Sequence, residues 1–241
     1  MAQENDKVQH TVEKTQKKSG DIENRLNVLR AGVLGANDGI ISTAGLVIGV
    51  ASATTNMMTV LIAGLAGLLA GALSMAGGEY SSVSTQKDVE KSEVEKEKKR
   101  LKEDFAGAKA ELAEYYQNGG LSPELSQQVA TELMKEDALA ARVKAKLNIT
   151  LGEYVNPWNA AFSSIISFSC GAIIPLLFIL FLPELYKIWG TFAAVSLALA
   201  LTGFISAALG GAPRLKAVIR NVIVGMLTMA VTYGLGQFVH I

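Results

Sequence analysis

An aspartate inside a long apolar segment is the first residue in this sequence that could do chemistry. Asp38 is the one charged residue between positions 31 and 53. A helix of about 20 mostly apolar residues spans a bilayer, so Asp38 is predicted to lie at membrane depth. A carboxylate there costs at least ~2.5 kcal/mol on insertion scales, and such residues usually face a protein interior or an aqueous path. The alternative is that Asp38 only hydrogen-bonds a neighbouring helix.

Two further candidate ligands, Met75 and Glu79, lie one helical turn apart at the end of the next apolar segment, 57–80. The connection between the two segments is short and uncharged, so they are predicted to be antiparallel neighbours. Asp38 then lies about 12 Å from the boundary that Met75 and Glu79 approach, at 1.5 Å per residue. Carboxylates suit Mg²⁺, Ca²⁺ or Mn²⁺, and an added thioether favours transition metals such as Fe²⁺. Ordinary packing remains the alternative for Met75.

A second group of acids recurs every seven residues in a polar segment: Glu90, Glu97, Asp104 and Glu111, with Glu114 one turn beyond. On a helix these acids flank an apolar stripe, and none has a basic residue four positions further on to neutralise it. They could bind a cation. The alternative is a charged coiled-coil flank whose basic partners lie on another helix.

Five long segments with almost no charge define the elements that must position these residues, and half of the 241 residues are hydrophobic. They are predicted to be five transmembrane helices at 31–53, 57–80, 160–182, 188–211 and 222–239. The fold class is therefore all-α, a polytopic membrane protein with a helical module between the second and third spans. The predicted domains are an N-terminal arm (1–25), transmembrane helices 1 and 2 (26–85), the module (86–155) and transmembrane helices 3 to 5 (156–241).

The module is predicted to contain three helices. An amphipathic helix over 86–118 ends at a Gly-Gly pair, and Ser122 followed by Pro123 starts a second helix that runs to about residue 136. A third, short helix covers 138–147. Residues 1–20 are predicted to be disordered, followed by a short amphipathic helix at the membrane surface.

The distribution of Lys and Arg predicts the orientation. Basic residues concentrate in the arm, the module and the 211–220 loop, which fall on one side of the membrane in a five-span arrangement. The N-terminus and the module are therefore predicted to be cytoplasmic, and the C-terminus outside.

Several functions are disfavoured by composition. The single cysteine, Cys170, allows no intrachain disulfide and is predicted to be a small core residue. His10 and His240 are terminal and lie on opposite sides, so a histidine metal site is not expected. Basic and acidic residues are equally numerous, 22 each, so no excess of positive charge indicates nucleic-acid binding. No nucleophile–base pair or cofactor loop is present, so we expect neither an enzyme nor a bound cofactor.

Four motifs resemble the vacuolar iron transporter family in its bacterial branch: Ala-Asn-Asp-Gly-Ile-Ile-Ser-Thr at 36–43, Ser-Met-Ala-Gly-Gly-Glu-Tyr at 74–80, Asn-Pro-Trp at 156–158 and Pro-Leu-Leu at 175–177. The resemblance implies a homodimer in a bacterial plasma membrane, with a translocation path between the two first helices. It also implies movement of Fe²⁺ or Mn²⁺ out of the cytosol in exchange for protons, the metal being substrate. Asp38 and Met75 match the pore acid and pore methionine of the family.

The resemblance also extends to the module. Glu97, Glu111 and Glu114 match ligand glutamates of the family's cytoplasmic metal-collecting domain, and Met134 matches its methionine. This chain departs from the family at three positions: Gly67 replaces a glutamate that eukaryotic members use in proton coupling, and Arg100 and Lys135 stand where acids are expected. Glu79 is a candidate substitute for the glutamate missing at Gly67. A competing interpretation is a membrane-anchored scaffold or sensor whose module binds a partner.

Overall fold

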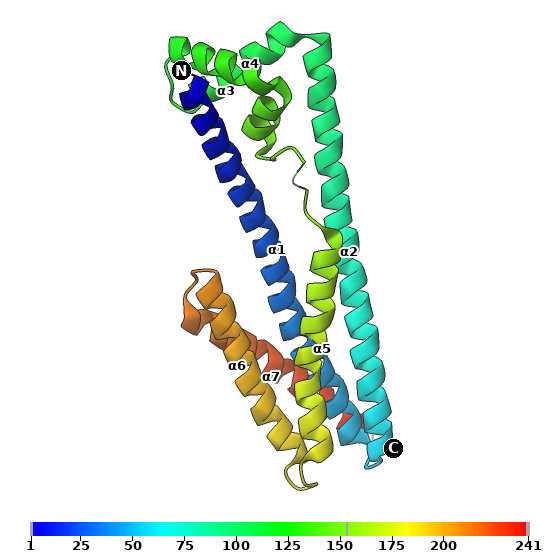
Figure 1. The fold of residues 1–241 in the computed structure, drawn as a ribbon. Helices are drawn as coiled ribbons and strands as arrows, with labels where there is room; N and C mark the ends of the chain where they lie inside the picture. The colour runs from blue at the N-terminus through cyan, green and yellow to red at the C-terminus, as the bar shows by residue number, and fades with distance from the viewer. Residues whose placement is uncertain (1, 153, 240–241) are drawn as a thin grey trace. The chain divides into compact units, whose positions relative to one another are not determined.

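The computed structural model describes residues 2–152 and 154–239, with side chains from residue 28 onward (Figure 1). The described residues form α-helices joined by short connections, as predicted. The helices are α1 (Ala2–Ala53), α2 (Met57–Glu103), α3 (Phe105–Asn118), α4 (Pro123–Leu147), α5 (Pro157–Phe181), α6 (Lys187–Leu209) and α7 (Arg214–Val239). His240 lies outside the described residues.

Five helices are long and apolar enough to cross a membrane, which confirms the predicted polytopic membrane protein. The apolar stretches lie in Val28–Ala53 of α1, in the first half of α2, and in α5, α6 and α7. The chain divides into two compact units. A membrane unit comprises residues 26–81 and 157–239, and a helical module comprises residues 82–156 together with the first 25 positions.

The membrane unit is held together by close helix packing around α1. A Cβ atom placed on Gly39 would overlap the main-chain carbonyl of Phe168, and one on Gly171 would overlap that of Ala36, so α1 and α5 approach backbone to backbone. On α7, Thr228 packs against the α1 backbone. The apolar core joins all five spans through Ile40, Ala44, Val47, Ile48, Val60, Leu176, Ile179, Phe192, Val195, Leu199 and Met229.

The predicted continuous helix over 86–118 is wrong at one residue. Asp104 leaves the helical conformation (φ −150°, ψ 81°), and its carboxylate accepts a hydrogen bond of 2.8 Å from the main-chain N–H of Gly107. An aspartate in this position caps the N-terminus of the next helix, a local preference that the seven-residue pattern does not register. Where the helix restarts, the Phe105 side chain is 52% exposed.

The other helix boundaries of the module agree with the sequence. Ser122 accepts a hydrogen bond from the N–H of Leu125 and caps α4, with Pro123 at the first helical position. Asp137 is non-helical (φ −148°, ψ 102°) and accepts a hydrogen bond from the N–H of Ala140, which confirms a new helical segment where the third helix was predicted. Its last residue is followed by Asn148 in the left-handed conformation.

The backbone of α1 is helical from Ala2. The disorder expected for residues 1–20 stays a prediction. This segment has no proline and is rich in Glu, Gln and Lys, which favour helix. Cys170 is exposed rather than buried in the core. It lies on a helix that is apolar on every side, so composition does not tell which face packs inward.

Candidate functional site

Asp38 and Met75 line one pocket of about 470 Å³ inside the membrane unit. The pocket lies between α1, α2 and α5, and its other lining residues are Ser42, Thr43, Leu46, Gly67, Gly71, Ser74 and Phe168. On α1 the lining follows the four-residue spacing of one helix face, from Asp38 through Ser42 to Leu46. The antiparallel pairing of the first two spans therefore brings the predicted acid and thioether to the same space.

The Asp38 carboxylate is available to a ligand. Asp38 is exposed in the single chain and makes no hydrogen bond or ion pair through its carboxylate to any described residue. The Ser42 hydroxyl donates to the Asp38 main-chain oxygen at 2.6 Å, which leaves the Ser42 oxygen itself able to accept or coordinate. One carboxylate, one thioether and nearby hydroxyl oxygens make a mixed hard and soft donor set.

Glycines on α2 keep this pocket open. A Cβ on Gly71 would overlap the ring of Phe168, and a Cβ on Gly67 would overlap the tip of the Leu46 side chain. Phe168 is 2% exposed and held in place, whereas the end of a leucine side chain moves readily. A larger side chain at position 67 would thus displace Leu46 and reach the pocket that contains Asp38.

Glu79 lies one turn beyond Met75 on α2 but does not line this pocket. Its Oε2 atom is buried and has no hydrogen-bond partner among the described residues. A buried carboxylate oxygen without a partner is costly, and it is satisfied by a proton, a cation or an added donor. Glu79 thus keeps one buried carboxylate oxygen without a partner among the described residues, one helical turn from Met75.

In the module, Glu97 and Glu111 meet around a basic side chain instead of forming an open acidic site. Nη2 of Arg142 lies 2.6 Å from Oε2 of Glu97 and 2.8 Å from Oε2 of Glu111. The Arg142 side chain is fully buried, and it also donates to the main-chain oxygen of Ala108. Lys146 Nζ lies 2.8 Å from Glu111 and 3.3 Å from Glu97.

Arg100 completes this cluster, with Nη2 lying 2.8 Å from Oε1 of Glu111. Hydrogen bonds from Lys146, then Arg142 and Arg100, hold the pKa of the Glu111 carboxyl far below its usual range. We call these five residues, Glu97, Arg100, Glu111, Arg142 and Lys146, the arginine-centred cluster. Two of the carboxylates that the sequence singled out as metal ligands, Glu97 and Glu111, are thus neutralised by basic side chains of the same chain.

The other two predicted ligands of the module lie elsewhere. Met134 is 5% exposed and packs in an apolar core with Leu112 and Ala130. Glu114 lines a separate pocket between α3 and α4 that also contains Lys109. No group of three or more His, Cys, Asp or Glu residues is close enough to hold a metal within the part of the chain that the structure describes.

Sequence reasoning did not identify Arg142 and Lys146. The one available signal was their own spacing: they are four residues apart on the short third helix, so both project from the same face. The coiled-coil alternative required basic partners on another helix, and this pair supplies them for Glu97 and Glu111. It does not supply one for Glu114.

Five helices long and apolar enough to span a membrane define an integral membrane protein, with Asp38 in a pocket between three of them, α1, α2 and α5. A sequence profile of the VIT family matches residues 29–237. A vacuolar iron transporter of Acanthamoeba castellanii is 42% identical over 212 residues, which are 86% of this chain and 77% of that protein. Vacuolar iron transporter homolog 4 of Arabidopsis thaliana is 35% identical over 241 residues, 99% of this chain and 98% of that protein.

Vacuolar iron transporter homolog 3 of Arabidopsis thaliana is 36% identical over 230 residues, 95% of this chain and 91% of that protein. The chain belongs to the VIT family, a family of transporters and not of enzymes. The resemblance carried by the four sequence motifs is confirmed at the level of the family.

Proposed function

We propose that this protein moves a divalent metal, Fe²⁺ and/or Mn²⁺, out of the cytosol in exchange for protons. The observation that carries the proposal is the pocket shared by Asp38 and Met75, in which the carboxylate has no partner among the described residues. A membrane protein that retains such an acid uses it for binding or conduction. The relatives in Acanthamoeba and Arabidopsis, which are named for iron, support the choice of metal.

The donor set supports a first-row transition metal over Mg²⁺ or Ca²⁺. Asp38 supplies a hard oxygen ligand and Met75 a soft sulfur ligand. Mg²⁺ and Ca²⁺ prefer oxygen ligands and gain little binding energy from sulfur. The oxygen of Ser42 is a further donor at the same pocket. The metal is here a transported substrate that must be released again. A site of moderate affinity therefore suits transport better than a site that encloses the metal in a full set of protein ligands.

A homodimer would complete the coordination. One chain offers one carboxylate and one thioether, fewer donors than Fe²⁺ or Mn²⁺ requires, while two copies facing each other across α1 would double both. The face of α1 that lines the pocket supports such a partner, since Asp38, Ser42 and Leu46 are exposed in the single chain. The path is accordingly proposed to run between the two copies of α1.

Protons and orientation belong to the same proposal. Glu79, with a buried oxygen that lacks a partner, is the candidate proton carrier in a chain that has Gly67 where a glutamate was expected. The concentration of Lys and Arg in the module and the 211–220 loop favours a cytoplasmic module. The bacterial plasma membrane stays a prediction.

The test is metal uptake into inverted vesicles or proteoliposomes, with Fe²⁺, Mn²⁺, Co²⁺ and Zn²⁺ compared. Asp38→Asn keeps side-chain size and removes the charge, so we expect flux to fall by at least tenfold while expression and dimerisation persist. Asp88→Asn makes the same chemical change at an exposed position of α2 outside the apolar span and should transport normally. Near-normal flux in Asp38→Asn would rule out the pore assignment.

The arginine-centred cluster is the one observation that favours the competing function, a membrane-anchored scaffold or sensor. With Glu97 and Glu111 held by Arg142, the module resembles a structural or partner-binding unit, as a scaffold or sensor would need. Metal collection by Glu97, Glu111, Glu114 and Met134 stays a prediction, and it would require these ion pairs to open. A scaffold would show no metal flux in the vesicle assay.

A further inference from the structure

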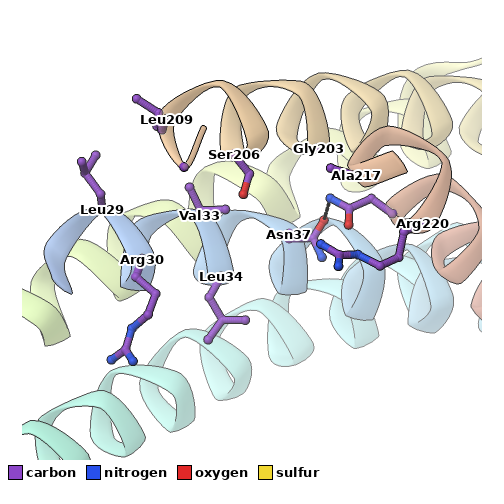
Figure 2. A pocket seen from close by; sticks show the side chains of 12 residues that line it. Leu29, Arg30, Val33, Leu34, Asn37, Gly203, Ser206, Leu209, Ala217 and Arg220 are labelled. Carbon is purple, nitrogen blue, oxygen red and sulfur yellow. Dashed lines mark hydrogen bonds between the residues drawn. The ribbon is translucent and has the colours of Figure 1, made fainter. Parts of the chain in front are cut away.

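A second pocket in the membrane unit has a character opposite to that of the Asp38 pocket. It measures about 420 Å³, lies between α1, α6 and α7, and shares no lining residue with the first (Figure 2). Two arginines, Arg30 and Arg220, line it, and none of its lining residues is acidic. Its chemistry suits an anion rather than a metal ion.

Neither arginine is neutralised by an acidic residue that the structure describes. Arg30 and Arg220 make no ion pair with any described residue, in contrast to Arg100 and Arg142 of the module. A guanidinium beside apolar side chains at the membrane boundary is costly unless it reaches water or meets an anion. The pocket therefore has unmatched positive charge.

The deeper part of the pocket is polar. The Asn37 side-chain oxygen accepts a hydrogen bond of 3.1 Å from the Asn221 amide, which fixes α1 against α7. Figure 2 shows the Arg220 side chain extending from α7 toward Asn37, and the Ser206 hydroxyl turned toward α1. Guanidinium, amide and hydroxyl groups are the donors that phosphate oxygens accept from.

The remaining wall is apolar and sets the kind of ligand. Leu29, Val33, Leu34 and Leu209 line the same space. Figure 2 shows Arg30 near one end and Arg220 near the other, and Arg30 lies seven residues, or about 10 Å of helix, from Asn37. An inorganic phosphate is too small to use both arginines and the leucine wall.

We propose that this pocket binds an anionic phospholipid from the leaflet on the Arg30 side, with its phosphate on Arg30, oxygens of its glycerol or ester groups within reach of Arg220, and an acyl chain along the leucines. The location agrees, because Arg30 directly precedes the first apolar segment and so lies at headgroup depth. The bound lipid would bridge α1, the helix that contains Asp38, to the α6–α7 pair.

The experiment is native mass spectrometry of the full-length protein, purified in detergent and mixed with equal amounts of phosphatidylglycerol and phosphatidylcholine. We expect phosphatidylglycerol adducts to dominate. Each of Arg30→Gln and Arg220→Gln should weaken that preference by about fivefold, the value of one basic residue near an anionic lipid surface. Arg214→Gln is the matched control, since Arg214 lies over the Phe204 ring and does not line the pocket.

Three results would overturn the proposal: equal adducts of the two lipids with the unaltered protein, an unchanged preference in the Arg30→Gln, Arg220→Gln double variant, or an equal loss in Arg214→Gln. Displacement of the lipid by excess inorganic phosphate would instead identify a site for free anions and overturn the lipid assignment. Arg220→Lys, which keeps the charge, should retain the preference and so separates lipid binding from misfolding. No metal is added, so the outcome is independent of transport.

Discussion

Removing Arg142 should destabilise the module more than removing any other basic residue of the arginine-centred cluster. Arg142→Met keeps most of the side-chain length, but it leaves the nearly buried carboxylate of Glu97, 14% exposed, with only Lys146 at 3.3 Å. Breaking a buried ion pair by removing one partner typically costs 3–5 kcal/mol. Glu111 keeps Arg100 and Lys146, so we expect the lower end, about 3 kcal/mol, or roughly a 150-fold increase in local opening.

Hydrogen exchange of the full-length protein, followed by mass spectrometry on peptides from α3 and α4, measures this opening directly. Lys146→Met is the control, because its side chain is 34% exposed and exposed pairs contribute about 1 kcal/mol or less. If Arg142→Met changes exchange no more than Lys146→Met does, the cluster is not what holds the module together. Protection restored to Arg142→Met by added Mn²⁺ would show that the freed carboxylates can bind metal.

Three further outcomes are expected. Met75→Leu, similar in volume, should reduce Fe²⁺ transport more than Mn²⁺ transport, because Mn²⁺ gains less from a thioether; an equal loss for both metals would make Met75 a packing residue. Because the folded-state pKa of Glu111 is lowered from its usual value of 4.5, its stabilising contribution is complete above that value and is lost as pH falls toward the folded-state pKa. The stability of the module, followed by circular dichroism as the pH is lowered, should therefore depend less on pH in Glu111→Gln than in the unaltered protein. The same pH dependence in both proteins would contradict this. Glu79→Gln should weaken the dependence of metal flux on an imposed pH gradient in proteoliposomes, and full retention of that dependence would exclude Glu79 as the proton carrier.

The sequence by itself determined the features that depend on local pattern and on the bilayer. Long uncharged segments specify five spans because only a helix satisfies its backbone in lipid. The short connection after Ala53 makes the first two spans antiparallel, which is enough to bring Asp38 and Met75 to the same part of the membrane unit. Ser122 and Pro123 start a helix through contacts within one turn, so their role was predictable.

Only the tertiary structure decided what the acids of the module meet. The seven-residue recurrence placed Glu97, Asp104 and Glu111 on one flank but gave no information about the facing helix. Asp104 turned out to be a cap because its carboxylate bonds a backbone N–H three residues ahead, which ends α2. Arg142 reaches Glu97 and Glu111 across 45 and 31 residues of sequence, a register that depends on how α4 packs and not on any local spacing. Helix periodicity specifies a face, whereas the partner of that face is set by packing between helices.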